Sequence, residues 1–113
     1  PNNEVLIAER AGVPVGCLHI LATTDFFGAR HAHISVIATT EAAEGSGVGQ
    51  ALLRHAEGWA RHRDYPLLTL NVFATNSRAR RFYEVAGWKH DGTVTSERVD
   101  CEMRPTVRYR VEL

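Results

Sequence analysis

Residues 76–88 read Asn76-Ser77-Arg78-Ala79-Arg80-Arg81-Phe82-Tyr83-Glu84-Val85-Ala86-Gly87-Trp88. Small and aromatic side chains recur in this stretch at intervals of three and four residues, which places them on one face of a helix. The inward-facing positions are Ala79, Phe82, Tyr83 and Ala86. Asn76 or Ser77 can cap the start of this helix, and Gly87 stands where a helix ends. The stretch therefore predicts a short helix whose arginines form a solvated face.

A second informative stretch lies upstream and reads Glu44-Gly45-Ser46-Gly47-Val48-Gly49. It opens another helical pattern, in which apolar residues recur from Val48 to about His62. Glycines permit positive φ angles and close backbone approach, and the free N–H groups of a helix N-terminus favour an anion. A phosphate or pyrophosphate would fit here, and turn glycines without a ligand are the alternative. The Gly-Lys-Ser/Thr ending of a nucleotide P-loop is absent.

Most of the remaining chain is typical of β-strands. Short apolar or β-branched runs are bounded by Gly, Pro, Asp and Asn, as strands usually are. The expected strands cover residues 4–9, 15–22, 33–39, 67–74, 93–95 and 107–113. Residues 23–32 look like a loop, and residues 67–74 are apolar on both faces, as in an interior strand. Because a helix separates the runs at 33–39 and 67–74, these two strands are expected to be parallel.

Composition limits the class of protein. The chain has 113 residues, 44% of them hydrophobic, which suits a single domain with its own core. The 13 basic and 13 acidic side chains cancel, so a strongly basic nucleic-acid or membrane-surface protein is not expected. Cys17 and Cys101 are too few and too far apart for a disulfide framework, which favours a reducing cytoplasm. No run is long and apolar enough for a membrane span.

The two glycine-containing stretches together resemble the GNAT superfamily of N-acetyltransferases. Residues 76–88 are similar to that family's Asn-x-x-Ala-x-x-Phe-Tyr-x-x-x-Gly-Phe pattern, with Trp88 in the last aromatic position. Residues 45–49 resemble its pyrophosphate loop, Gln/Arg-x-x-Gly-x-Gly/Ala, although Glu44 puts a negative charge beside this loop. The two matches occur in the family's order, separated by one helix and one strand. The resemblance covers residues 4–113.

The resemblance implies an α/β fold of the α+β three-layer GNAT type. Its central sheet would be mixed and mostly antiparallel, with flanking helices and one parallel strand pair, 33–39 and 67–74, that splays apart. We expect residues 1–113 to form a single domain that lacks the family's usual N-terminal strand and helices. A homodimer is a further possibility that the family suggests.

The resemblance also implies that acetyl-coenzyme A (acetyl-CoA) lies in the splayed opening as cosubstrate. Main-chain groups of residues 37–39 would pair with the pantetheine arm, and amides of residues 45–49 would receive the pyrophosphate. Asn76 would bond the pantetheine or the thioester region. The coenzyme-binding positions implied in this way are Ile37, Ala38, Thr39, Gly45, Gly47, Val48, Gly49, Asn76 and Ala79.

Tyr83 and His33 are the implied catalytic residues. Tyr83 would protonate the departing thiolate, since a phenol held near the sulfur can donate its proton. The alternative for Tyr83 is a core aromatic residue on a helical stripe. His33 alternates with His31 and Ser35 on one face of a strand and would act as general base. A surface histidine and a His-x-His metal pair are the alternatives for His33, and because no third ligand is evident we expect no metal site.

These residues predict an N-acetyltransferase that moves acetyl from acetyl-CoA to a primary amine of a small molecule or peptide by direct attack. Two alternatives are a catalytically silent coenzyme A-binding regulatory module and an interaction domain whose glycines only make turns. The resemblance implies that the acceptor contacts the N-terminal strand and helices and the loop between the last two strands, here about residues 96–106. That loop holds Glu97, Asp100 and Glu102, which could attract a cationic amine or could simply be solvated.

Overall fold

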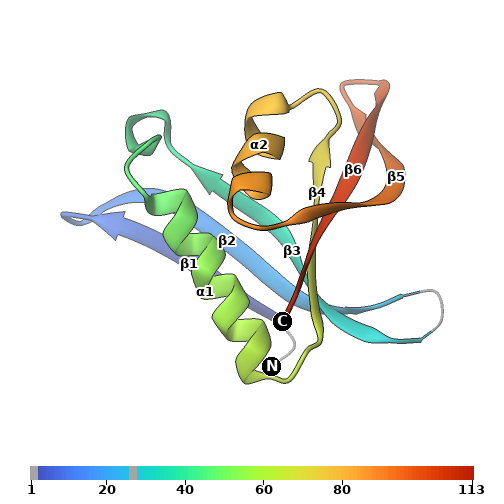
Figure 1. Cartoon of the computed structure of the whole chain (residues 1–113). Coiled ribbons are helices and arrows are strands. Elements are labelled where there is room, and N and C mark those ends of the chain that lie inside the picture. The colour runs from blue at the N-terminus through green and yellow to red at the C-terminus, as the bar shows by residue number, and fades with distance from the viewer. Residues whose placement is uncertain (1–2, 26–27) are drawn as a thin grey trace.

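The computed structural model describes residues 3–25 and 28–113. These residues form one six-stranded sheet, two α-helices and a short 3-10 helix (Figure 1). The elements in chain order are β1 (Asn3–Arg10), β2 (Val13–Thr24), β3 (Arg30–Thr39), the 3-10 helix η1 (Glu41–Ala43), α1 (Val48–His62), β4 (Leu67–Phe73), α2 (Ser77–Val85), β5 (Lys89–Val99) and β6 (Glu102–Glu112).

The sheet has the strand order β1-β2-β3-β4-β6-β5. Only β3 and β4 are parallel, and the other neighbouring strands are antiparallel. This confirms the mixed, mostly antiparallel sheet with one parallel pair that the sequence predicts. β4 lies inside the sheet between β3 and β6, as its apolar composition predicts, but helices cover only one of its faces.

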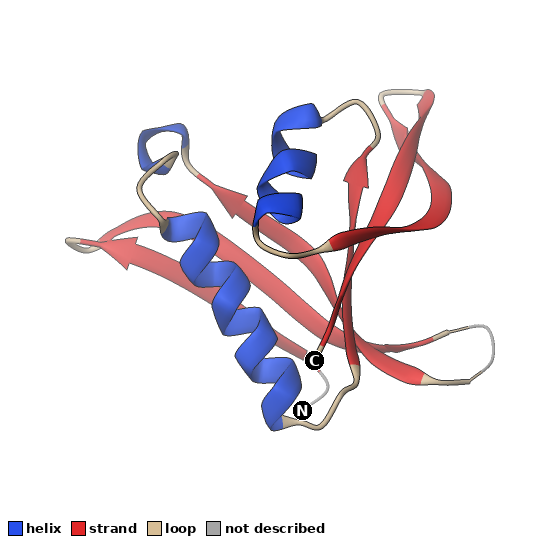
Figure 2. Ribbon diagram, in the orientation of Figure 1, coloured by secondary structure: helices blue, strands red, loops and turns tan. Residues whose placement is uncertain are grey.

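Both α-helices lie on the same face of the sheet (Figure 2). Residues that pair across neighbouring strands share a face, so Ile20, Ile34 and Leu70 all point toward the helices. They join one core with the buried stripe of α1, which consists of Leu52, Leu53, Ala56, Trp59 and Ala60. In the part of the chain that the structure describes, no helix covers the other face.

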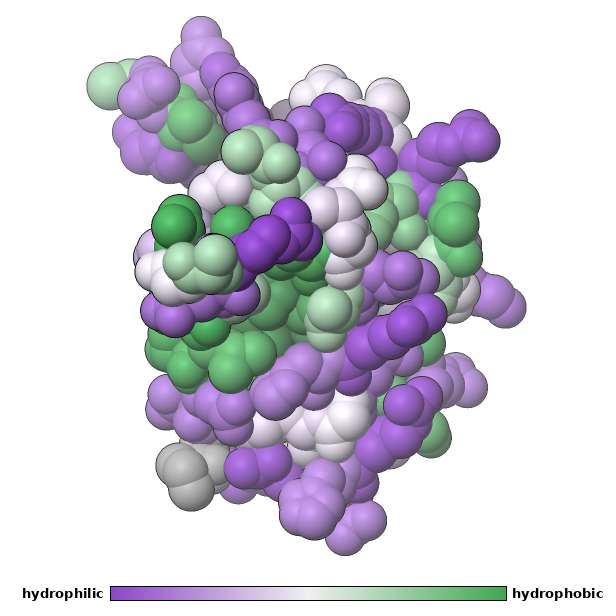
Figure 3. Space-filling view, turned by 90° about the vertical axis from the view of Figure 1, so that its left-hand side faces the viewer, coloured by the Kyte–Doolittle hydropathy of each residue, from purple (hydrophilic) through white to green (hydrophobic). Residues whose placement is uncertain are grey.

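The helix-free face of the sheet is partly apolar near β1. Val5, Ile7 and Val36 expose 64%, 52% and 46% of their surface there, so they add little to the core. Figure 3 views the molecule from the side where the β1–β2 hairpin ends, and hydrophobic side chains (green) gather there among hydrophilic ones.

Two loops expected from the sequence are shorter than predicted. Residues 23–24 pair with 30–31, so both ends of the loop expected at 23–32 belong to β2 and β3, and its residues 26 and 27 lie outside the described residues. The expected loop at 96–106 is a β5–β6 hairpin closed by Asp100 and Cys101, whose φ angles of 49° and 70° suit a tight turn. Both segments carry polar residues on both faces, so no hydrophobic alternation marks them as strands.

The two cysteines, Cys17 and Cys101, are both free thiols. Neither α1 nor α2 is long and apolar enough to span a membrane, and the same holds for any helix among the described residues.

Candidate active site

The parallel strands β3 and β4 are paired over a short distance only. Their register joins Ala32 to Leu68, His33 to Thr69 and Ile34 to Leu70, and the pairing ends there. Beyond this point residues 36–39 of β3 pair only with β2, and residues 71–73 of β4 pair only with β6. The two strands therefore separate and leave an opening in the middle of the sheet.

A β-bulge in β3 marks the point where the strands separate. His19 pairs with Val36 and Ile20 pairs with Ile34, so Ser35 is an extra residue in β3. A bulge bends its strand and increases the local twist, which turns residues 35–39 away from β4. The side chain of Ser35 is held by a hydrogen bond of 3.1 Å between its Oγ and Nδ1 of His19.

A cavity of about 320 Å³ occupies the helix side of this opening. Its walls come from β3, β4, α2 and the β5–β6 hairpin. Four residues predicted for the coenzyme or catalytic site line it, namely Ile37, Asn76, Ala79 and Tyr83. Ala38 and Thr39 end β3 beyond the cavity and do not line it. The structure thus brings the opening and the start of α2 together, as the motif in residues 76–88 implies.

α2 is fixed over this cavity by its cap and by Arg80. Oδ1 of Asn76 accepts a hydrogen bond of 3.2 Å from the Ala79 amide, which confirms Asn76 as the helix cap. Arg80 was expected on a solvated face, but its guanidinium donates to the Ala74 carbonyl at 3.0 Å and to the Tyr109 hydroxyl at 3.1 Å. Tyr109 in turn donates to the carboxylate of Glu84. These bonds fix α2 against β4 and β6.

Only one residue of the predicted inward stripe of α2 is fully buried. Tyr83 is 8% exposed, whereas Phe82 is 37% exposed and Ala86 is also exposed. The stripe is narrower than predicted because α2 lies over the opening, where the sheet offers no continuous surface to pack on.

The Tyr83 ring packs between aromatic neighbours, 6.1 Å from the ring centroids of both Trp88 and Tyr109. Its hydroxyl makes no hydrogen bond to any of the residues that the structure describes, so it is available to a ligand in the cavity. Burial raises the pKa of the Tyr83 phenol above its usual range, so it is protonated at neutral pH.

The glycine-rich loop lies beside α2. Gly45 and Gly47 have φ angles of 75° and 91°, which a residue with a side chain rarely adopts. Gly47 is the N-cap of α1, and no side chain caps the helix, so the amides of its first turn, beginning at Val48 and Gly49, are left to a ligand or to water. A Cβ placed on Gly49 would lie 3.5 Å from Cζ of Phe82, so the first turn of α1 is in close contact with α2.

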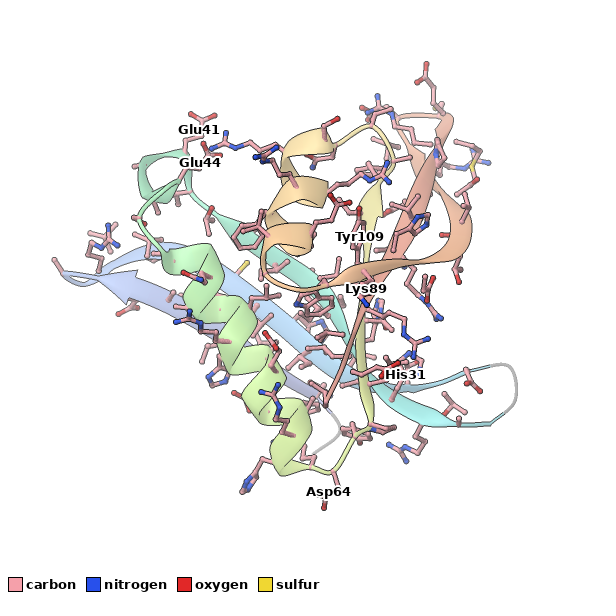
Figure 4. The ribbon with its side chains drawn as sticks, in the orientation of Figure 1. His31, Glu41, Glu44, Asp64, Lys89 and Tyr109 are labelled. Carbon is pink, nitrogen blue, oxygen red and sulfur yellow. The ribbon has the colours of Figure 1, made fainter. Side chains whose placement is uncertain are left out.

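The unexpected negative charge in this loop has a partner. The Glu44 carboxylate lies 3.1 Å from the guanidinium of Arg78, on α2. In Figure 4, Glu44 lies on the part of the loop that faces α2. Both side chains are largely solvated, so the pair contributes little stability, but it joins the glycine-rich loop to α2.

His33 lies on the helix-free side of the opening. Its Nδ1 is 2.7 Å from Oγ1 of Thr69, which is fully buried beside it. Burial, together with the charges of His31 and Arg108, lowers the pKa of His33 to about 4. The imidazole is therefore neutral at pH 7. No group of three or more potential metal ligands occurs within residues 3–25 and 28–113.

A second cavity, of about 370 Å³, lies on this side of the opening. Its walls include His33 and residues 95–97 of β5, and it shares Ile34, Ser35, Asn71, Glu97 and Thr106 with the first cavity. The two cavities therefore meet at the opening, one reaching α2 and the other reaching His33. Sequence reasoning missed Asn71, although a polar side chain inside an apolar strand is a signal that could have indicated it.

Comparison with known proteins agrees with this architecture. A sequence model of the acetyltransferase (GNAT) family matches residues 1–88, whereas no curated protein matches the chain. A ribosomal-protein-alanine N-acetyltransferase from Brucella melitensis superposes with a TM-score of 0.82 at 26% identity, covering 96% of this chain and 68% of that one.

Two further solved structures are similar at 20% identity. Naa50 from Arabidopsis thaliana, in complex with the bisubstrate analogue CoA-Ac-MVNAL, has a TM-score of 0.82 and covers 96% of this chain and 72% of its own. The IAA acetyltransferase from Bacillus cereus has a TM-score of 0.81, with 99% and 79% covered. The six-stranded sheet, the opening between β3 and β4 and the match over residues 1–88 lead to one conclusion: the chain belongs to the acetyltransferase (GNAT) family.

Proposed function

We propose that this protein transfers the acetyl group of acetyl-CoA to a primary amine of a small molecule or peptide. The observation that carries the proposal is the opening between β3 and β4, with the Tyr83 phenol on its helix side and a second cavity on the other. The similar Naa50 structure holds a bisubstrate analogue that contains coenzyme A, which supports coenzyme binding by this fold.

The coenzyme would occupy the helix side of the opening. Residues 35–39 of β3 have no partner strand on the side facing β4, so their backbone groups can pair with the amides of pantetheine. The uncapped first turn of α1, with the loop of Gly45 and Gly47, offers amides and a positive dipole end to the pyrophosphate. Asn76 lines the cavity on the helix side of the opening.

The reaction would proceed by direct attack. The neutral amine nitrogen forms a bond to the thioester carbonyl carbon, and a free backbone N–H of β3 stabilises the developing oxyanion. The carbon–sulfur bond then breaks, and the thiolate takes a proton from the Tyr83 hydroxyl. The proton that the attacking nitrogen loses as the amide forms returns the Tyr83 phenolate to the phenol. Before the attack the acceptor loses a proton from its ammonium group, and neutral His33, directly or through water, is the group we assign to accept it.

Thiol release tests the proposed function. Calorimetry should show binding of acetyl-CoA, and addition of an amine should release free coenzyme A thiol at the rate at which acetylated amine forms. Binding without thiol release over a broad panel of amines would support a catalytically silent coenzyme-binding module. If acetyl-CoA does not bind, the proposed function is wrong, and only the membership of the fold family stands.

Substitution of Tyr83 by Phe should keep the ring packing and remove the proton donor. We expect kcat to fall about 100-fold, within the range that general acid catalysis usually contributes, while the Kd of acetyl-CoA changes little. Steady-state rates and calorimetry measure the two quantities. A Tyr83→Phe enzyme as fast as the wild type at every pH would remove Tyr83 from the mechanism.

The pH profile tests His33. Because its folded-state pKa is about 4 rather than near 6.5, the neutral base persists to low pH, and kcat/KM should fall on the acid side only as the pH approaches 4. His33→Gln should lower kcat/KM about 100-fold and abolish that limb, whereas His62→Gln, an exposed change on α1, should do neither. Circular dichroism at each pH separates titration from unfolding. An unchanged profile in His33→Gln would contradict the assignment.

Glu44 should weaken coenzyme binding through repulsion of the pyrophosphate. Glu44→Gln removes this charge and frees Arg78, so the Kd of acetyl-CoA should fall about threefold to fivefold, as expected for exposed charges. Glu41→Gln, on the neighbouring 3-10 helix, is the matched control and should change the Kd less. Weaker binding by Glu44→Gln would show instead that Glu44 serves to position Arg78.

A further inference from the structure

We propose that the cavity beside His33 selects a small hydrophilic amine, such as an amino sugar or another polyhydroxylated amine, and that Glu97 binds the cationic group of this acceptor. This inference rests on the proposed function, because it names the acceptor class of the same site. The second cavity is defined above by its position on the helix-free side of the opening and by its volume of about 370 Å³.

The walls of this cavity consist almost entirely of hydrogen-bonding groups. Ile34 is the one apolar residue among the eight that line it. Hydroxyl groups come from Ser35, Thr95, Ser96 and Thr106. No aromatic residue other than the imidazole of His33 lines the cavity, so an aryl group would find no apolar ring to stack on.

Such a lining discriminates against apolar acceptors. Ser35 already bonds His19, and the Thr95 and Thr106 hydroxyls bond each other. The side chains of Asn71, Ser96 and Glu97 have no such partner among the described residues, so a bound apolar group would shield them from water without replacing its hydrogen bonds, which is unfavourable. A site built to hydrogen-bond its substrate can reject an analogue that lacks the matching groups by several orders of magnitude. The volume is also at the low end of the range for small-molecule sites, which favours a small acceptor over a peptide.

Glu97 supplies the negative charge. It is the only acidic residue that lines either cavity among the residues that the structure describes, and it lines both. Its cross-strand neighbour Arg104 has its guanidinium 3.9 Å from Glu102 instead. The Glu97 carboxylate has no ion-pair or hydrogen-bond partner within the described part of the chain. It can therefore bind the ammonium of an incoming amine where the two cavities meet.

A panel of acceptors with a matched pair of variants tests this inference. The thiol-release assay is run with glucosamine, phenylethylamine and a short peptide with a free N-terminus, all at saturating acetyl-CoA. We expect kcat/KM for glucosamine to exceed that for the other two by at least about tenfold. Glu97→Gln should raise the KM for glucosamine about tenfold and leave the KM for acetyl-CoA unchanged.

Asp100→Asn is the control, because it removes one negative charge from the same hairpin, lines neither cavity and leaves the pair of Arg104 with Glu102 in place. Faster acetylation of phenylethylamine or of the peptide would overturn the inference, as would equal effects of the two substitutions. If no amine releases thiol, the proposed function fails. Calorimetry then decides the inference by measuring whether glucosamine binds to the complex of this protein with coenzyme A. If glucosamine binds and Glu97→Gln weakens this binding, the inference is supported. If glucosamine does not bind, the inference is overturned.

Discussion

Three residue pairs between β3 and β4 hold the two halves of the sheet together, and the rest of the structure depends on where this pairing stops. Ala32, Leu68 and Thr69 are fully buried at the junction, so it is dry and well packed. Longer pairing would close the sheet and remove the opening. Without these three pairs, β1-β2-β3 and β4-β6-β5 would be joined mainly through α1, which packs on β2, β3 and β4. The bulge at Ser35 sets the limit by bending β3 away.

The same junction divides the chemistry between two faces. Alternation along the strands sends Ile34 and Leu70 to the helix side and His33 and Thr69 to the other. The amides of the first turn of α1 and the Tyr83 phenol of α2 lie on the helix side. The polar cavity lies on the other side. The cosubstrate and the acceptor can therefore approach the opening from opposite faces of the sheet and meet there, which suits direct transfer of the acetyl group.

The sequence predicts those features that depend on local patterns. Helical periodicity and flanking glycines gave α1 from Val48 to His62 correctly, and Asn76 does cap α2. The predictions that are wrong, and the features that the sequence does not predict, depend on how strands distant in sequence pair. The bulge at Ser35, the hairpin over residues 96–106 and the position of Glu97 at both cavities follow from pairings that no local pattern reveals. The ion pair of Glu44 with Arg78 likewise joins segments that are distant in sequence.

The opening leaves unpaired strand edges inside the protein. Residues 35–39 and 71–73 each have a backbone edge with no neighbouring strand, and such edges can pair with another polypeptide chain. Unpaired edges of this kind are a local aggregation hazard when nothing covers them. A ligand whose amides occupy the opening removes that hazard and, by binding only the native state, also raises stability by mass action. On this view the cosubstrate protects the solubility of the fold as well as supplying the acetyl group.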